Sequence, residues 1–140
     1  MSIRGFDHVA ITASDIERTL AFYRDVLGAE VLYEDLWRKG VIPIVSLQLG
    51  ANRINVHDAA SPASPHARLP TPGSQDLCFR WQGTVAQAIR LLEARGIAVL
   101  DSPVKRPAAD GELGESVYFR DPDDNLLELL TTEHEEGDSR

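Results

Sequence analysis

The chain has 140 residues, of which 43% are hydrophobic and 26% are charged, a composition typical of globular proteins. Its formal net charge of −8 argues against binding to nucleic acids or anionic membranes, because both need basic surfaces. A single cysteine, Cys78, excludes an intrachain disulfide and a cysteine-rich zinc site. No apolar run approaches the roughly 20 residues that span a bilayer, and the N-terminus lacks a signal-peptide core, so we expect a cytoplasmic protein.

The first half of the chain predicts one strand, one helix and three further strands. Residues 7–12 (DHVAIT) are rich in β-branched side chains, which favours a strand. A capping box at 14–17 (SDIE) begins a helix with apolar residues at helical spacing, and Gly28 ends it in the left-handed conformation typical of helix ends. Three strands are expected after the helix, at 29–37, 41–49 and 53–58.

The second half repeats this pattern after a linker at residues 59–74, which is rich in proline, alanine and serine and has no periodicity. Residues 75–81 (QDLCFRW) predict a strand, and a capping box at 84–87 (TVAQ) begins a helix that ends at Gly96. Three strands and a longer loop are expected after this helix: strands at 97–100, 115–120 and 125–131, and the loop at 101–114.

Equivalent residues of the two halves lie at regular separations, which indicates an internal repeat. Two residue pairs are 68 positions apart and a third, nearer the module ends, is 73 apart: Gly28 and Gly96 (96 minus 28), His8 and Asp76 (76 minus 8), and Asn55 and Glu128 (128 minus 55). We therefore predict one α+β domain at 1–131 made of two βαβββ modules, at 1–58 and 75–131. The acidic segment 132–140 is expected to be a disordered tail.

Alternation of side chains along four predicted strands separates an apolar face from a polar one. The apolar faces carry these residues: Val9, Ile11, Ile54, Val56, Leu77, Phe79, Leu127 and Leu129. The opposite faces carry these: His8, Asn55, His57, Asp76 and Glu128. We expect the two helices to cover the apolar faces and the opposite faces to form a cup.

Imidazoles and carboxylates on one concave surface are suitable ligands for a divalent metal ion. Glu128 stands between leucines (LLELL), where a carboxylate is costly to bury without a cation, hydrogen bonds or a raised pKa. Each residue also has a structural explanation: His8 at the surface, Asp76 paired with Arg80, Glu128 paired with Arg53 or Arg106, and His57 lining a pocket without touching metal. The linker His66 and the tail His134 are not candidates.

Two long motifs carry a family resemblance. Residues 6–11 (FDHVAI) with 15–28 (DIERTLAFYRDVLG), and residues 118–129 (YFRDPDDNLLEL), resemble the opening and closing motifs of the vicinal-oxygen-chelate superfamily, which includes glyoxalases, bleomycin-resistance proteins and extradiol dioxygenases. The middle of the chain, at 54–58 and 72–79, most resembles the glyoxalase-domain-containing protein 5 subgroup.

The resemblance implies a cupped mixed sheet around one metal ion, with helices on its outer face. His8 and Glu128 match ligand positions of the family, and Asp76 stands where many relatives carry histidine. Asn55 stands where glyoxalase I carries a glutamate, and His57, two residues further on, could replace that ligand. The expected metal site is therefore His8, His57, Asp76 and Glu128, with zinc, nickel, manganese, cobalt or iron as the ion.

The activity that the resemblance implies is that of a metal-dependent lyase, isomerase or transferase of glyoxalase type. Its substrate would be a small oxygen-rich or electrophilic molecule, with Glu128 and His57 as catalytic residues. One alternative is an Fe²⁺ ring-cleaving dioxygenase with His8, His57 and one carboxylate as ligands. Another is a non-catalytic drug- or metabolite-binding protein of the bleomycin-resistance type. A homodimer is expected, with no nucleic-acid or membrane partner.

Overall fold

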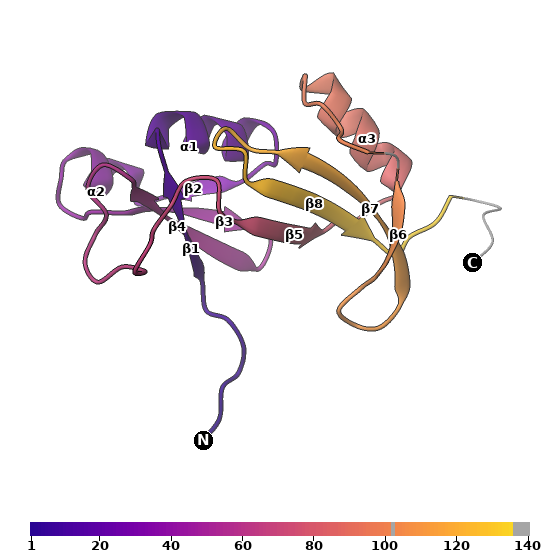
Figure 1. Ribbon diagram of the computed structural model, residues 1–140, viewed down its shortest axis with the longest axis horizontal. Helices are drawn as coiled ribbons and strands as arrows, with labels where there is room; N and C mark the ends of the chain where they lie inside the picture. The colour runs from indigo at the N-terminus through magenta and orange to yellow at the C-terminus, as the bar shows by residue number, and fades with distance from the viewer. Residues whose placement is uncertain (102, 136–140) are drawn as a thin grey trace. The chain divides into compact units, whose positions relative to one another are not determined.

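The computed structural model describes residues 1–101 and 103–135. Its internal contacts divide the chain into two compact units, Met1–Ser74 and Gln75–Arg140. Each unit contains one four-stranded mixed sheet with a helix after its first strand (Figure 1). The α+β class and the two βαβββ modules predicted from the sequence are therefore confirmed.

The first unit contains four strands and two helices: β1 (Val9–Ala13), α1 (Ile16–Asp25), β2 (Glu30–Leu32), α2 (Glu34–Arg38), β3 (Val45–Leu49) and β4 (Asn52–Asp58). The strand order in its sheet is β1-β4-β3-β2. Strand β1 runs parallel to β4, whereas the other neighbours are antiparallel. The first and last strands of the unit therefore lie side by side.

The second unit repeats this arrangement without a second helix: β5 (Asp76–Arg80), α3 (Val85–Ala94), β6 (Val104–Pro107), β7 (Leu113–Arg120) and β8 (Leu126–Thr131). Its strand order is β5-β8-β7-β6, with β5 parallel to β8. The long hairpin β7–β8 forms the centre of this sheet.

The repeat extends to the register of the strands. Ala10 pairs with Asn55 in the first sheet, and Cys78 pairs with Glu128 in the second. The separations within these two equivalences, 68 (78 minus 10) and 73 (128 minus 55), are those found in the sequence. Asn55 and Glu128 thus occupy the same place in two superimposable ladders.

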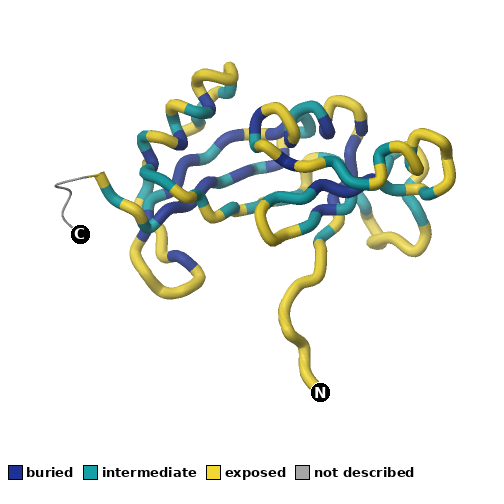
Figure 2. The backbone as a smooth tube through the Cα atoms, turned by 180° about the vertical axis from the view of Figure 1, so that it is seen from behind, coloured by how far each residue is buried: buried dark blue, intermediate teal, exposed yellow. Residues whose placement is uncertain are grey.

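The helices cover the apolar faces of the sheets, as predicted. Helix α1 buries Ile16, Leu20 and Tyr23 and packs against β2 and β4, and α3 packs against β7 and β8. Five strand residues at predicted core positions are buried: Ile11, Ile54, Val56, Leu127 and Leu129. Figure 2 shows that buried residues lie mainly on the strands and on the inner sides of the helices, with the loops exposed.

The ends of both long helices follow local chemistry. The Thr84 side chain accepts a hydrogen bond from the Gln87 backbone N–H, and the Gln87 side-chain oxygen accepts one from the Thr84 backbone N–H. The predicted capping box of α3 is therefore confirmed. The cap of α1 is Asp15, which accepts from the Arg18 N–H at 3.2 Å, and not Ser14 as the predicted box required. Gly28 and Gly96 follow the helices with φ of 73° and 72°, the left-handed conformation that favours glycine.

Two predicted strands are wrong. The stretch 29–37 was expected to be one strand, but β2 ends at Leu32, and Tyr33, with φ of 65°, turns the chain into α2. The predicted strand at 97–100 is absent, and β6 lies instead within the expected loop 101–114. Only the Leu100 N–H joins the sheet there, by donating to the Tyr118 carbonyl at 2.9 Å.

The connecting segments carry little regular structure. Residues 59–74 contain turns and bends but neither helix nor strand. At the start of the expected acidic tail, the Glu133 carboxylate accepts from the Gly83 N–H at 2.7 Å, and residues 136–140 lie outside the described part of the chain. None of the described helices is long and apolar enough to cross a membrane.

Candidate metal and substrate site

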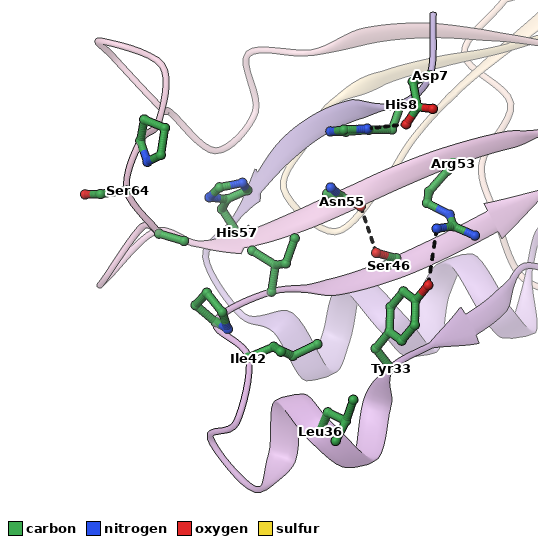
Figure 3. Close-up of a pocket in the computed structure, with 14 residues that line it drawn as sticks. Asp7, His8, Tyr33, Leu36, Ile42, Ser46, Arg53, Asn55, His57 and Ser64 are labelled. Atoms are coloured by element: carbon green, nitrogen blue, oxygen red, sulfur yellow. Dashed lines mark hydrogen bonds and ion pairs between the residues drawn. The ribbon is translucent and has the colours of Figure 1, made fainter.

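The first unit holds a cavity of about 700 Å³, lined by the residues before β1, by β3 and the loop before it, by β4, by α2 with its N-cap, and by the linker. Asp7, His8, Tyr33 and Arg53 give it a polar and charged region. Figure 3 shows Arg53 and Tyr33 on one side of this cavity and His57, with Ile42 and Ser64, on the other side. The lining therefore combines a cationic region with an apolar one.

His8 lies immediately before β1, and its Nδ1 is 2.8 Å from the Asp7 carboxylate. An ionised carboxylate can only accept, so Nδ1 carries the proton and Nε2 of a neutral imidazole keeps its lone pair. The hydrogen bond and charge of His8 hold the pKa of Asp7 below its usual range. A metal-binding imidazole commonly donates its other ring N–H to a carboxylate in this way, which fixes the orientation of the ring.

His57 lies in β4 and faces the same cavity as His8. Its Nδ1 is buried and has no hydrogen-bond partner among the described residues. A buried ring nitrogen without a partner is costly, so a ligand that supplied one would bind favourably here.

The register separates the two histidines along the sheet. Thr12 pairs with His57, so His8 lies four residues before the level of His57 on the neighbouring strand. At about 3.3 Å per residue this amounts to roughly 13 Å along the strand. That separation favours His57 as a pocket residue and disfavours His8 and His57 as neighbouring ligands of one ion.

Asn55 lies between these levels and is held by a neutral partner. The Ser46 hydroxyl donates to its Oδ1 at 2.7 Å from the paired strand β3. Both side chains line the cavity. In this protein a hydrogen-bonded amide therefore stands at the position where, by the sequence resemblance, glyoxalase I carries a glutamate.

Glu128 and Asp76 lie on neighbouring strands of the second sheet. Asp76 pairs with Leu126, and Cys78 pairs with Glu128. The two carboxylates therefore lie on the same face of the sheet, and their positions along the strands are two residues apart. Asp76 is exposed, whereas Glu128 is partly buried and accepts a short hydrogen bond from the Ser116 hydroxyl. Partial burial and the negative charge of Glu128 raise the pKa of the Cys78 thiol to about 12.

The ion pairs that could have explained the carboxylates structurally are not those that form. Arg80 pairs with Asp110 at 3.2 Å, and Arg106 donates to the Tyr118 hydroxyl at 3.2 Å. Among the described residues of the second unit, no basic side chain forms an ion pair with Glu128.

Each unit supplies two of the four predicted metal ligands. Among the described residues, no three His, Cys, Asp or Glu side chains are gathered closely enough to hold an ion. Within the units, His8 and His57 line one cavity, and Asp76 and Glu128 share one sheet face. Imidazole nitrogen with carboxylate oxygen is a donor set that fits zinc, nickel, manganese, cobalt or iron.

Sequence reasoning missed four polar residues of these two faces: Tyr33, Ser46, Arg53 and Ser116. Arg53 begins the predicted strand 53–58 and shares its parity with Asn55 and His57, so the alternation along that strand was the signal that could have placed it in the cup. Tyr33 had no such signal, because its contribution depends on a left-handed backbone conformation inside a segment that reads as a strand.

Comparison with known proteins identifies the family. The sequence model described as the Glyoxalase/Bleomycin resistance protein/Dioxygenase superfamily matches residues 5–129. The chain belongs to this superfamily. Its members include metal-dependent epimerases, glyoxalases and fosfomycin-modifying enzymes.

Three relatives within the superfamily match most of the chain. The glyoxalase domain-containing protein RDO1 of Mycosarcoma maydis is 41% identical over 129 residues, covering 92% of this chain and 69% of the relative. Virulence protein STM3117 of Salmonella typhimurium is 39% identical, with 92% and 85% covered, and its crystal structure matches with a TM-score of 0.83 over 94% and 98% of the chains. An ethylmalonyl-CoA/methylmalonyl-CoA epimerase of Cereibacter sphaeroides is 30% identical, with 88% and 94% covered.

Proposed function

We propose that this protein is a metal-dependent lyase, isomerase or transferase of glyoxalase type that acts on a small oxygen-rich or electrophilic molecule. The observation that carries the proposal is Glu128, a partly buried carboxylate on a leucine-rich strand whose protein partner is a hydroxyl and not a cation. Such a charge is stable when a cation binds it. Family membership supports a divalent metal as that cation.

The ligands in this proposal are His8, Asp76 and Glu128. Support for His8 comes from Asp7, which fixes the tautomer that leaves Nε2 available. Support for the two carboxylates comes from their shared face and adjacent strands. When bound, the metal would act as a Lewis acid that polarises substrate oxygens.

His57 has the role of a pocket base or orienting group in this proposal. His57 lines the cavity near Ile42 and the linker, where its imidazole can exchange a proton or hydrogen bond with a bound substrate. The roughly 13 Å along the strand to His8 disfavours the dioxygenase alternative, which needs His8 and His57 on one iron. Glu128 is the second candidate base, if it leaves the metal during turnover.

Metal content of variants tests the ligand set. Wild type, Glu128→Ala, His57→Ala and Asn55→Ala are loaded with the same ion, desalted and analysed for metal. We expect Glu128→Ala to lose most of the metal, because a charged ligand is removed, and His57→Ala to keep most of it. Asn55→Ala is the matched control, since it truncates the equivalent position of the first module without changing charge.

The outcomes separate the competing functions. Full metal content in Glu128→Ala contradicts the proposed ligands. A His57→Ala variant that loses as much metal as Glu128→Ala makes His57 a ligand and restores the dioxygenase alternative, which oxygen consumption then checks. If the wild type takes up no transition metal, the protein is better described as a binding protein of the bleomycin-resistance type.

A further inference from the structure

Arg53 is a cation in the wall of the cavity whose hydrogen-bond partners, Gln48 and Tyr33, are neutral, while its charge helps to hold the pKa of Asp7 below its usual range. Its Nε donates to the Gln48 side chain at 3.3 Å, and Nη1 lies 3.5 Å from the Tyr33 hydroxyl. No carboxylate among the described residues forms an ion pair with it, although the chain carries 22 acidic residues. Its Nη2 and much of the donor edge of its guanidinium therefore remain available to a ligand.

Tyr33 is held in a costly backbone conformation that serves this arginine. Its φ of 65° is rare for a large aromatic residue, and it places the ring with its centroid 5.8 Å from the Arg53 guanidinium carbon. Gln48 and Tyr33 together restrict the rotation of the guanidinium. Figure 3 shows the contact between Arg53 and Tyr33. A guanidinium held in one orientation loses less entropy when it binds a planar or tetrahedral oxyanion.

The charges around Arg53 leave room for an anion. Asp7 is the carboxylate among the residues that line the cavity, and it accepts from His8 at 2.8 Å while its side chain is 96% exposed. A divalent ion on His8 would offset this negative charge, so the positive charge of Arg53 would remain unbalanced in the cavity. To this extent the inference rests on the proposed function.

The remaining walls limit what the anion is attached to. Leu36, Ile42, Pro43 and Ile44 also line the cavity. These side chains favour a short carbon chain and offer no charged group to a second polar end. A cavity of about 700 Å³ is in the range of small-molecule sites.

We propose that Arg53 and Tyr33 form an oxyanion subsite, and that the substrate carries a carboxylate or phosphonate group on a short carbon chain. The guanidinium binds two oxygens of the group through its terminal N–H donors, and the Tyr33 hydroxyl is placed to donate to a third. The carbon chain then lies along the apolar wall towards His57. The far end of the chain is thereby brought to His57, the pocket base of the proposed function.

Binding of simple anions tests the subsite without knowledge of the substrate. The affinities of butyrate and propylphosphonate for metal-loaded protein are measured by ligand-observed NMR, with butyramide as the neutral probe. We expect the wild type to bind at least one anion more tightly than butyramide. Arg53→Gln should lower the affinity for that anion by at least about tenfold. Arg53→Lys should recover part of the affinity, and comparison of the two anions identifies the preferred oxyanion.

A matched control and a separate measurement keep the outcomes apart. Arg106 in the second unit also donates to a tyrosine hydroxyl but does not line this cavity, so Arg106→Gln should leave anion binding unchanged. Equal anion affinity in wild type and Arg53→Gln, or binding of butyramide as tight as that of the anions, overturns the subsite. Metal content is measured on the same samples. If the metal content is normal and anion affinity does not depend on Arg53, the proposed function stands and the oxyanion subsite is wrong. If the protein holds no metal and anion affinity depends on Arg53, the oxyanion subsite stands and the proposed function is wrong.

Discussion

In the first module Ala10 pairs with Asn55, and in the second Cys78 pairs with Glu128, so an amide and a carboxylate occupy equivalent positions of two similar sheets. Serine hydroxyls donate to both groups, from Ser46 and from Ser116. The serine–amide pair is neutral. The serine–carboxylate pair keeps a negative charge on a leucine-rich strand, which favours an additional cation.

The edges of the two sheets differ as well. After β2 the first module continues through Tyr33 into α2, and both contribute residues to the wall of the cavity. The second module has instead the edge strand β6, whose Lys105 lies 3.8 Å from Glu115 on the paired strand β7. One ladder has thus acquired a walled cavity with an arginine, and the other a carboxylate pair. The two modules therefore share a frame, while each carries a different part of the proposed chemistry.

The strongest test of the shared frame is a matched pair of core truncations. Ile54 and Leu127 are equivalent residues (127 minus 54 is again 73) and are 3% and 0% exposed. We expect Ile54→Ala and Leu127→Ala each to lower the free energy of unfolding by about 2–5 kcal/mol, because each leaves a cavity in a core. Leu69→Ala, at a residue 78% exposed, is the control and should change stability by less than about 0.5 kcal/mol. Urea denaturation measures all three, and a loss at only one of the two core sites breaks the equivalence.

The serine pair tests the difference in charge. Ser46 and Ser116 are 3% and 0% exposed. Ser46 donates to Asn55, and Ser116 donates to Glu128. Ser116→Ala removes a hydrogen bond to a charged acceptor and should cost about 1.5–3 kcal/mol in metal-free protein, whereas Ser46→Ala removes a neutral one and should cost about 0.5–1.5 kcal/mol. Equal losses in urea denaturation would mean that Glu128 does not keep its charge in the folded protein.

The parts of the molecule that follow periodicity could be predicted from sequence. Alternation along β1, β4, β5 and β8 identified the buried faces, and the constant separations identified the equivalence of Asn55 and Glu128. Short elements at the sheet edges could not be predicted in this way. Helix α2 has five residues, and its Arg38 forms an ion pair with the distant Glu17 at 2.7 Å. Local propensity does not encode a partner 21 positions away.

The polar residues of the site divide along the same line. His8, His57, Asp76 and Glu128 stand out in the sequence because a polar group interrupts an apolar pattern. Arg53 and Tyr33 contribute through a tertiary contact between β4 and the turn before α2. Such a contact depends on the placement of two segments 20 positions apart, and no single-segment pattern predicts it.

The reactivity of the Cys78 thiol depends on the charge of Glu128, which lies on the neighbouring strand of the second module. Partial burial, and then the negative charge of Glu128, raise the pKa of this thiol to about 12, so at pH 8 fewer than about one thiol in a thousand is ionised. Thiol reagents should therefore react slowly with metal-free folded protein at pH 8 and faster as the pH rises. Glu128→Gln removes a negative charge, so the pKa falls and the rate at pH 8 should rise by about tenfold. Asp76→Asn is the control with a smaller expected increase, because Asp76 contributes less to the pKa of Cys78.

The smallest expected difference concerns the caps of the two equivalent helices. The Asp15 side chain caps α1 by accepting from the Arg18 N–H, whereas Thr84 caps α3 in a reciprocal box with Gln87. Asp15→Ala and Thr84→Ala should each cost about 1 kcal/mol of unfolding free energy. The Asp15 cap is charged and interacts with the helix dipole, so about 0.3–1 kcal/mol of its effect should disappear at high salt. Thr84 is neutral, so its effect should not depend on salt. Urea denaturation at low ionic strength and in concentrated sodium chloride compares the two variants, and an equal salt dependence would show that the charge of Asp15 contributes nothing to its cap.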